Sequence, residues 1–278
     1  MQHLNISYFQ TTIVWEDRKR NRENYEQKLN AFQEKTDIIL FPEMFDTGFT
    51  MNPENIHEKD HFQTLSWMKK MAARYDTAFG GSVAAYENKQ FFNRFYFVDP
   101  SGNVLWYDKK HLFRMGQEPK HYSPGNQKLL IEYKGWKILP LICYDLRFPK
   151  WSANQLTDNG PAYDLLIYVA NWPAPRHQVW QNLLQARAIE NQSYCIGVNC
   201  VGKDGNKLLY KGGSTVYNAK GEIMARSAPY LDDVVTVEIS KEELDSFRKK
   251  FPVYKNNWLI NVSIVENRSL LLRKCCIQ

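Results

Sequence analysis

Short apolar runs alternate with amphipathic stretches along most of the chain. The apolar residues Tyr25, Leu29 and Phe32 recur at intervals of four and three, which predicts a helix over 20–32. Further helices are expected over 62–75 and 178–191, and another is expected to begin near Pro149, a residue suited to a first helical turn. Largely apolar runs of five to ten residues predict strands over 3–9, 37–41, 77–86, 91–99, 104–108, 136–142, 164–171, 194–202, 214–218 and 234–239.

The connections between these runs are of two kinds, which indicates a mixed sheet. The turn signal PSGN at 100–103 separates two strands and predicts an antiparallel pair, and NAKGE at 218–222 marks a hairpin-like turn. Other strands are joined through helices, as parallel strands require. The sequence therefore predicts a mixed α/β layer protein with parallel and antiparallel strands. No linker divides it, so we expect one domain over 1–255, followed by a tail over 256–278 whose role the pattern does not indicate.

Composition and charge exclude several classes of partner. The chain has 278 residues, of which 44% are hydrophobic, enough for a sizeable core. Its formal charge of +6 comes from scattered basic residues, and the densest cluster, RKRNR at 18–22, is typical of a solvated helix face. We therefore expect no nucleic-acid partner. No run reaches the ~18 apolar residues of a membrane helix, and the first ten residues lack a secretory pattern, so no membrane partner is expected either.

The five cysteines indicate reduced thiols and no bound metal. An odd number in a long chain without a signal argues against a disulfide framework and for the cytoplasm. No CxxC and no zinc-like Cys/His spacing is present, and His111 and His121 lack a third ligand nearby. Cys195 and Cys200 lie within an apolar strand and are expected in the core. We expect neither a metal nor another cofactor.

Three predicted strands end in residues that carry chemistry. DIILF runs into Glu43, VLWYD runs into Lys109, and KILPLI runs into Cys143. Each has an ordinary explanation, since charged residues flank many strands and free cysteines are often buried. Ligands of α/β proteins nevertheless gather at the carboxyl ends of strands. We expect the three ends to face the same rim of one sheet, where the side chains would meet.

A carboxylate, an ammonium and a thiol together suit acyl transfer. A free cysteine has a pKa of about 8.5, so its thiol needs a base to become a good nucleophile near neutral pH. The carboxylate can take the thiol proton and later return it to a leaving amine. The ammonium and a backbone N–H can stabilise the oxyanion that develops on the attacked carbonyl. On the residues alone, Cys143 as a nucleophile and Cys143 as a core residue both remain open.

Six ordered segments resemble the nitrilase, or carbon–nitrogen hydrolase, superfamily. They are FPEMF, YDKKHLF, EPKHYSPG, LICYDLRFP, VANWP and LLQARAIENQ. The resemblance covers residues 3 to about 250. It implies a four-layer α-β-β-α sandwich and subunits that commonly pair, so we expect a homodimer or a higher homo-oligomer.

The resemblance also assigns roles by matched position. It implies that Cys143 is the nucleophile, Glu43 the general base and Lys109 the catalytic lysine. Glu118, in EPKHYSPG, matches a second glutamate that helps to position Lys109 and the attacking groups. The backbone N–H of Tyr144 would complete the oxyanion site.

The segments FPEMFDTGFTM, CYDLRFPKW and ANWPAPR are most similar to the omega-amidase branch of the superfamily. Omega-amidases release ammonia from the terminal amide of 2-oxoglutaramate or 2-oxosuccinamate, which the cysteine would do through a thioester intermediate. Such a substrate has an anionic end, which a guanidinium binds well. Arg147 and Arg176 are the candidates for this contact, and an ordinary structural ion pair is the alternative for each. For the aromatic residues near the reactive segments, a place in the core and a place in the wall of a small pocket both remain open: Phe45, Phe113, Tyr144 and Trp172.

Two other classes of function remain to be weighed. Within the superfamily, the alternative substrates are a nitrile, a carbamoyl amino acid or another small amide. The alternative of a different class is a non-catalytic binding module, although such a module would need none of the four reactive side chains. A panel of small amides and nitriles separates these alternatives.

Overall fold

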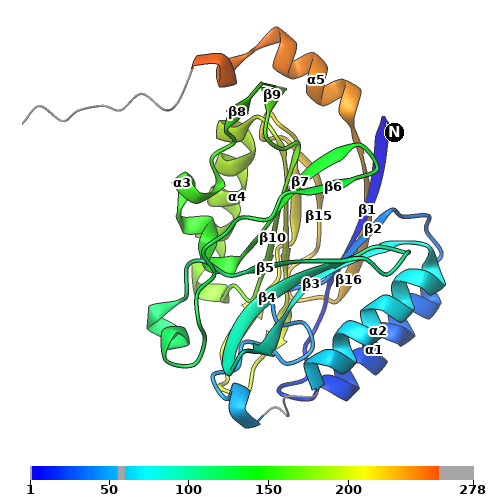
Figure 1. Ribbon diagram of the computed structural model, residues 1–278, viewed down its shortest axis with the longest axis vertical. Coiled ribbons are helices and arrows are strands. Elements are labelled where there is room, and N and C mark those ends of the chain that lie inside the picture. The colour runs from blue at the N-terminus through cyan, green and yellow to red at the C-terminus, as the bar shows by residue number, and fades with distance from the viewer. Residues whose placement is uncertain (1, 56–59, 159, 257–278) are drawn as a thin grey trace, which may run out of the picture.

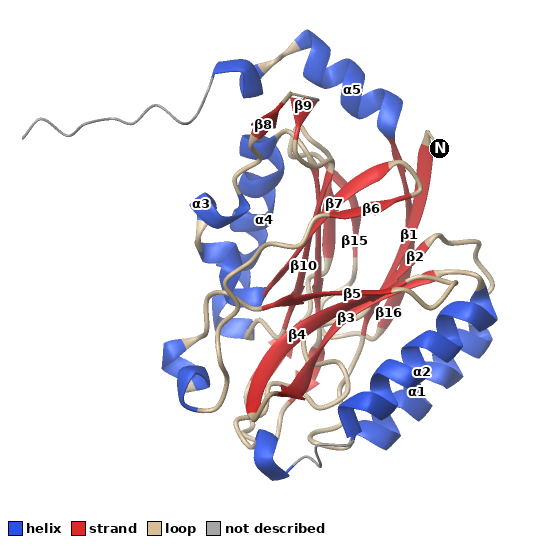
Figure 2. Cartoon of the chain, in the orientation of Figure 1, coloured by secondary structure: helices blue, strands red, loops and turns tan. Residues whose placement is uncertain are grey.

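The computed structural model describes residues 2–55, 60–158 and 160–256. All but the first residue of the expected 256–278 tail lies outside the described residues. The chain folds into two six-stranded mixed sheets (Figures 1 and 2). The first contains, in spatial order, β16 (Asp233–Ser240), β1 (His3–Gln10), β2 (Ile38–Leu40), β3 (Ala78–Glu87), β4 (Gln90–Val98) and β5 (Val104–Asp108). The second contains β15 (Ile223–Arg226), β14 (Thr215–Tyr217), β11 (Tyr194–Asn199), β10 (Leu165–Ala170), β7 (Trp136–Ile142) and β6 (Ile131–Tyr133).

Both sheets combine parallel and antiparallel pairs. Strand β2 runs parallel to both β1 and β3, and β10 runs parallel to both β7 and β11. The remaining pairs within the two sheets are antiparallel, including β4 with β5 across the PSGN turn, as the sequence predicted. The parallel strands end at residues 40, 142 and 170, directly before chain segments that carry polar side chains.

Helices cover the outer faces of the sheets. Helices α1 (Arg18–Ala31) and α2 (Asp60–Tyr75) lie together on the first sheet, and α4 (His177–Asn191) packs on β11 and β14 of the second (Figure 1). The short α3 (Pro149–Ser152) and α4 both contact the 3-10 helix Cys143–Arg147, and α5 (Lys241–Lys250) follows β16. Two small two-stranded sheets complete the fold: β8 (Leu156–Thr157) with β9 (Gly160–Pro161), and β12 (Val201–Lys203) with β13 (Leu209–Lys211).

Two apolar cores hold these layers together. One fills the space between the sheets with residues such as Tyr8, Phe95, Trp136 and Leu165, and it extends through the second sheet to Trp180 of α4, all of them fully or almost fully buried. The other lies between the first sheet and helices α1 and α2. Strand β10 is buried along its whole length because its two faces meet different layers, which explains its continuous apolar sequence. The layered α-β-β-α arrangement predicted through the resemblance is confirmed.

Several local predictions need correction. The expected strand over 194–202 breaks at Cys200, where the chain leaves β11 and enters the small sheet with β12. The helix expected from Pro149 is only four residues long. Arg18 of the RKRNR cluster is buried, because its guanidinium pairs with buried Asp46 at 3.1 Å.

Candidate active site

Three strand ends converge, but from two sheets. Glu43 and Lys109 follow β2 and β5 of the first sheet, whereas Cys143 follows β7 of the second. The expectation that all three face one rim of a single sheet was therefore wrong. The side chains meet because the two sheets pack face to face, so that chain segments leaving both sheets approach one another. The order of strands, turns and helices along the chain does not specify how closely segments from different sheets approach one another.

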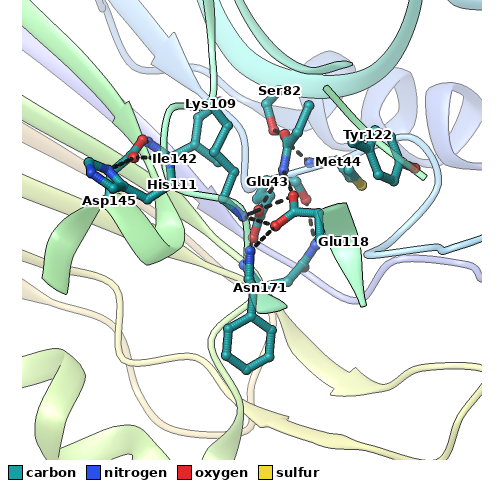
Figure 3. A network of polar contacts seen from close by, with 12 residues as sticks. Glu43, Met44, Ser82, Lys109, His111, Glu118, Tyr122, Ile142, Asp145 and Asn171 are labelled. Atoms are coloured by element: carbon teal, nitrogen blue, oxygen red, sulfur yellow. Dashed lines mark hydrogen bonds and ion pairs between the residues drawn. The ribbon is translucent and has the colours of Figure 1, made fainter. Parts of the chain in front are cut away.

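Lys109 is the centre of a buried charged network (Figure 3). Its Nζ donates to Glu43 Oε1 at 2.8 Å and to both carboxylate oxygens of Glu118, at 3.1 and 3.0 Å. The Asn93 amide donates to Glu43 Oε1 at 2.7 Å and to Glu118 Oε1 at 3.1 Å. All four side chains have no solvent exposure. Every donor of the ammonium thus has a carboxylate acceptor, which buried charges require.

The other side of Glu43 is held by Asn171, directly after β10. The Asn171 N–H donates to Glu43 Oε2 at 2.8 Å, and its side-chain amide donates to the Glu43 carbonyl at 2.8 Å. Neither Asn171 nor Asn93 was predicted from the sequence as a contributor to this site. Each is an amide in or directly after a largely apolar run, FFNRF for Asn93 and VAN for Asn171, and this was the available signal.

Cys143 lies at the start of a 3-10 helix in a strained conformation. Its φ is +44°, a left-handed value that is unfavourable for a side chain with a Cβ. Burial raises the pKa of its thiol well above the ordinary value, the Glu43 charge and a hydrogen bond to Glu43 raise it further, and the Lys109 charge opposes them. The resting thiol is therefore protonated near neutral pH, and Glu43, whose charge acts on this thiol, is the carboxylate that can accept its proton. The N–H of Tyr144, in the first turn of the same helix, is among those that lack an intrahelical acceptor.

Burial and the charges within the network shift the pKa values of both Lys109 and Glu118. Burial lowers the pKa of Lys109, but the charges of Glu118 and Glu43 outweigh it and raise that pKa overall. Burial raises the pKa of Glu118, and the nearby Lys109 charge offsets this only in part. Lys109 therefore stays charged, and Glu118 holds a proton more readily than an exposed glutamate does.

A cavity of about 530 Å³ opens above Cys143 and Glu43. Its walls include Phe113, Tyr144 and Trp172, all three of them predicted pocket residues. Lys109 and Glu118 do not line it and lie behind Glu43. The mouth is formed partly by the turn between β12 and β13, which contributes Asp204, Asn206 and Leu208.

Both predicted arginines line this cavity. The Arg147 guanidinium lies 5.4 Å from the Trp172 ring, and that of Arg176 lies 5.3 Å from the Phe113 ring. Among the described residues, neither arginine forms an ion pair with a carboxylate. Two cations thus face a largely apolar cavity that also exposes a thiol.

Phe45 does not line the cavity. It is fully buried in the core between the first sheet and the two helices that cover it, where its ring packs on Tyr25, Phe41 and Trp67. Its backbone N–H donates to the Ser82 carbonyl at 3.0 Å, and its ring contacts place its side chain on the helix side of the sheet. The prediction that Phe45 borders the pocket was therefore wrong.

The two other thiols in the described part of the chain are buried as expected. Cys195 lies in β11 with no exposure. Cys200 is also buried, but its Sγ donates to the Asn171 side-chain oxygen at 2.8 Å, so it is closer to the site than predicted. Within the described residues no three His, Cys, Asp or Glu side chains are grouped so that they could hold a metal ion. None of the described helices is long and apolar enough to cross a membrane.

Comparison with known proteins places this geometry in context. The family model for carbon–nitrogen hydrolases matches residues 5–249. The chain is 43% identical to omega-amidase YafV of Escherichia coli K12 over 258 residues, which is 92% of this chain and 97% of the relative. It is 31% identical to 2-oxoglutaramate amidase of Bacillus subtilis over 252 residues, which is 90% of this chain and 95% of the relative.

A solved structure shares the fold closely. The crystal structure of XC1258 from Xanthomonas campestris, a CN-hydrolase superfamily protein with an arsenic adduct in its active site, is similar with a TM-score of 0.90. It is 36% identical in sequence, and the match covers 95% of this chain and all of that one.

Proposed function

The chain belongs to the carbon–nitrogen hydrolase, or nitrilase, superfamily, and from that premise we propose that it is an omega-amidase. It hydrolyses the terminal amide of a small 2-oxo dicarboxylate monoamide, such as 2-oxoglutaramate or 2-oxosuccinamate, and releases ammonia. The observation that carries the proposal is that one cavity brings together a buried thiol, a buried carboxylate and the guanidinium groups of Arg147 and Arg176, which form no ion pair within the described part of the chain. The similarity to omega-amidase YafV and to 2-oxoglutaramate amidase over nine-tenths of the chain supports the same substrate class.

Acylation begins with proton transfer from Cys143 to Glu43. As Glu43 accepts the proton, Sγ attacks the amide carbonyl carbon, and the carbonyl π electrons move to oxygen. When the tetrahedral intermediate collapses, Glu43 returns the proton to the departing nitrogen and the C–N bond breaks. Ammonia leaves, and the acyl group remains on Cys143 as a thioester. The contacts from Lys109, Asn93 and Asn171 keep the Glu43 carboxylate in one orientation during these transfers.

Two groups can stabilise the oxyanion. The Tyr144 N–H is close to the nucleophile and needs no rearrangement, because it belongs to the same first helical turn. The three donors of Lys109 are all engaged in the resting state. To reach the oxyanion, the Lys109 Nζ must give up one of its longer hydrogen bonds to Glu118. The same hydrogen bond to Glu118 forms again when the oxyanion has collapsed.

Hydrolysis of the thioester reuses the same base. A water molecule attacks the thioester carbonyl while Glu43 accepts its proton. The C–S bond then breaks, the sulfur takes the proton from Glu43, and the carboxylic acid product leaves. The atoms balance without an oxidant, a reductant or a cofactor. The aromatic walls limit the water in the cavity, which strengthens the electrostatic interactions within it.

Ammonia release from a substrate panel tests the proposal. The panel is 2-oxoglutaramate, glutamine, a simple nitrile and a carbamoyl amino acid, each at equal concentration. We expect 2-oxoglutaramate to have the highest kcat/KM, since it alone combines a terminal amide with a singly anionic 2-oxo acid end. Preference for the nitrile or the carbamoyl amino acid would keep the catalytic residues but replace the substrate class. If no substrate of the panel releases ammonia, the omega-amidase assignment is wrong.

Arg147→Met is expected to raise KM for 2-oxoglutaramate by about 10- to 100-fold, since a charge-assisted hydrogen bond contributes roughly 1.5–3 kcal/mol. Arg147 is on the 3-10 helix that starts at Cys143, so its distance from the nucleophile is fixed by one short element. Methionine retains much of the side-chain length and removes the charge. Steady-state kinetics on 2-oxoglutaramate and on a neutral amide of the same length provide the measurement.

Arg176→Met is the matched control, because Arg176 lines the same cavity. If only Arg176→Met raises KM, the substrate carboxylate binds at Arg176. If neither substitution raises KM for the anionic amide more than KM for the neutral amide, the proposed recognition of an anionic end is wrong.

We also propose a single hydrolase domain over 1–255 that pairs as a homodimer or higher homo-oligomer in the cytoplasm. An apolar surface formed by α4 and β15 supports pairing, since Ile189 and Ile223 are each 50% exposed. Gln185 of α4 also donates to the carbonyl of Gly221, in the turn just before β15, so α4 contacts the chain where it enters this strand. The unpaired thiols Cys143, Cys195 and Cys200 suit a reducing compartment. Light scattering after size exclusion measures the assembly, and a monomer mass at every concentration would contradict pairing.

A further inference from the structure

Asp145, two residues after the nucleophile, is a fully buried carboxylate that accepts four hydrogen bonds. Its Oδ1 accepts from the His111 backbone N–H at 2.9 Å and pairs with His111 Nδ1 at 2.8 Å. Its Oδ2 accepts from the Tyr107 hydroxyl at 2.7 Å and from the Ile142 N–H at 3.1 Å. A buried carboxylate is costly unless it is satisfied in this way. The mechanism above assigns no role to it.

The donors come from both sheets and enclose the two reactive residues. Tyr107 and His111 lie two residues before and two residues after Lys109, on the segment that leaves the first sheet. Ile142 and Asp145 lie on either side of Cys143, on the segment that leaves the second sheet. Figure 3 shows Asp145, His111 and Ile142 grouped on one side of Lys109, with Glu43 and Glu118 on the other. One carboxylate therefore joins the lysine segment directly to the cysteine segment.

The cysteine segment requires such a restraint. Cys143 has a φ of +44°, and a residue in this region persists only where its surroundings hold it. The bond from the Ile142 N–H to Asp145 closes the turn around Cys143. On the other segment, His111 is stacked on Phe148 with ring centroids 3.7 Å apart and planes 8° apart, which adds a second contact between the segments.

We propose that Asp145 is a positioning residue that holds Lys109 in register with Cys143 across the two sheets. The inference rests on the proposed function, since it assumes that Cys143 and Lys109 take part in the same reaction. Asp145 does not touch the substrate, because it does not line the cavity. Its effect on the reaction passes through the positions of the two segments that it joins.

Asparagine cannot replace this carboxylate. If the amide oxygen of Asp145→Asn occupies the Oδ1 position, the NH2 group faces the Ile142 N–H and that donor loses its acceptor. If the oxygen occupies the Oδ2 position, the NH2 group faces the His111 N–H instead. In either orientation one of the two segments is released, although the side chain keeps its size.

The first measurement compares Asp145→Asn with Asp164→Asn. Asp164 is also buried and also accepts several hydrogen bonds, from Arg248, Lys241 and the Lys137 N–H, but it precedes β10 and does not line the cavity. We expect Asp145→Asn to lower kcat for 2-oxoglutaramate on the order of 10²-fold, the cost of a misplacement of about 1 Å, with KM changed less than about threefold. Asp164→Asn should lower the thermal midpoint without this loss of kcat.

The second measurement follows alkylation of Cys143 by iodoacetamide against pH, read from the Cys143 peptide by mass spectrometry. The Lys109 charge lowers the pKa of the Cys143 thiol, so the same displacement of about 1 Å away from the thiol should slow alkylation roughly fourfold at each pH on the rising limb. Asp164→Asn should follow the wild-type profile. Because this readout needs no amide substrate, it remains valid if the proposed substrate is wrong.

A folded Asp145→Asn with wild-type kcat and a wild-type alkylation profile would overturn the proposal. A loss of kcat that Asp164→Asn shares in proportion to its loss of stability would do the same. If Asp145→Asn does not fold, His111→Ala takes its place, since it removes the Nδ1 contact and the stacking on Phe148 but keeps Asp145. It should shift the alkylation profile in the same direction by a smaller amount, and an unchanged profile would overturn the proposal.

Discussion

Replacing Cys143 with alanine should abolish ammonia release, lowering kcat by at least about 10⁴-fold, while the chain stays folded. The thiol lies at the cavity floor beside Glu43, and no thioester can form without it. The stability change should stay within about 1 kcal/mol. Only one sulfur atom is lost, and the strained backbone at this position is the same for alanine as for cysteine.

Cys195→Ala is the matched control for this substitution. Cys195 is also a buried thiol, but it lies within β11 and does not line the cavity. The Cys195→Ala variant should retain the wild-type kcat and lose a little stability through the small void that forms in the core. Ammonia assays and thermal unfolding of both variants provide the measurement. The expected loss of about 10⁴-fold leaves only about 0.01% of the wild-type activity. More than about 1% residual activity in Cys143→Ala would contradict the nucleophile assignment.

Lys109→Met should remove activity and also destabilise the fold, by about 3–5 kcal/mol at neutral pH. Methionine leaves Glu43 and Glu118 fully buried without the cation that both carboxylates contact. Loss of the Lys109 charge removes the effect that opposes burial at Glu118, so the pKa of that carboxyl rises further. A carboxyl whose pKa is raised in the folded state stabilises that state at low pH, and this stability is lost as pH rises through the raised pKa.

The destabilisation of Lys109→Met should therefore shrink as pH falls from 7 toward the ordinary glutamate value of 4.5. Urea denaturation at several pH values measures this. Lys110→Met is the matched control, because Lys110 is the adjacent residue and its Nζ lies over the Trp151 ring at 5.7 Å. That variant should stay within about 1 kcal/mol of wild type and keep its activity. Equal losses of stability and activity in the two variants would contradict the central role of Lys109 in the network.

Local pattern predicted much of the fold. The helix over 20–32 is present as Arg18–Ala31, and the helix over 178–191 as His177–Asn191, because both have a helical apolar period that one face of a sheet can bury. Strand predictions succeeded where an apolar run ended in a clear turn, as with β4 and β5 around PSGN. They failed at Cys200, where the chain changes sheets without a change in its hydrophobic character.

The site shows a sharper division between what local pattern reveals and what it does not. Glu43, Lys109 and Cys143 were visible because each ends a strand, and Glu118 was visible through its motif. Asn93, Asn171 and Asp145 were not, since a polar residue beside an apolar run has no visible partner in the sequence. Phe45 was misplaced, because only packing against α1 and α2 decides which side of the sheet it faces.

By itself, the sequence determined the elements, the chemical groups that the chain carries and the family to which it belongs. These depend on residue type and on spacing along the chain, which periodicity and motif order express directly. Only the tertiary structure decided that the reactive groups come from two sheets, that Lys109 has no free donor at rest, and that Asp145 joins the lysine and cysteine segments. Hydrogen bonds and burial depend on distances of a few ångströms between residues far apart in the chain, and those distances are set when the two sheets pack together.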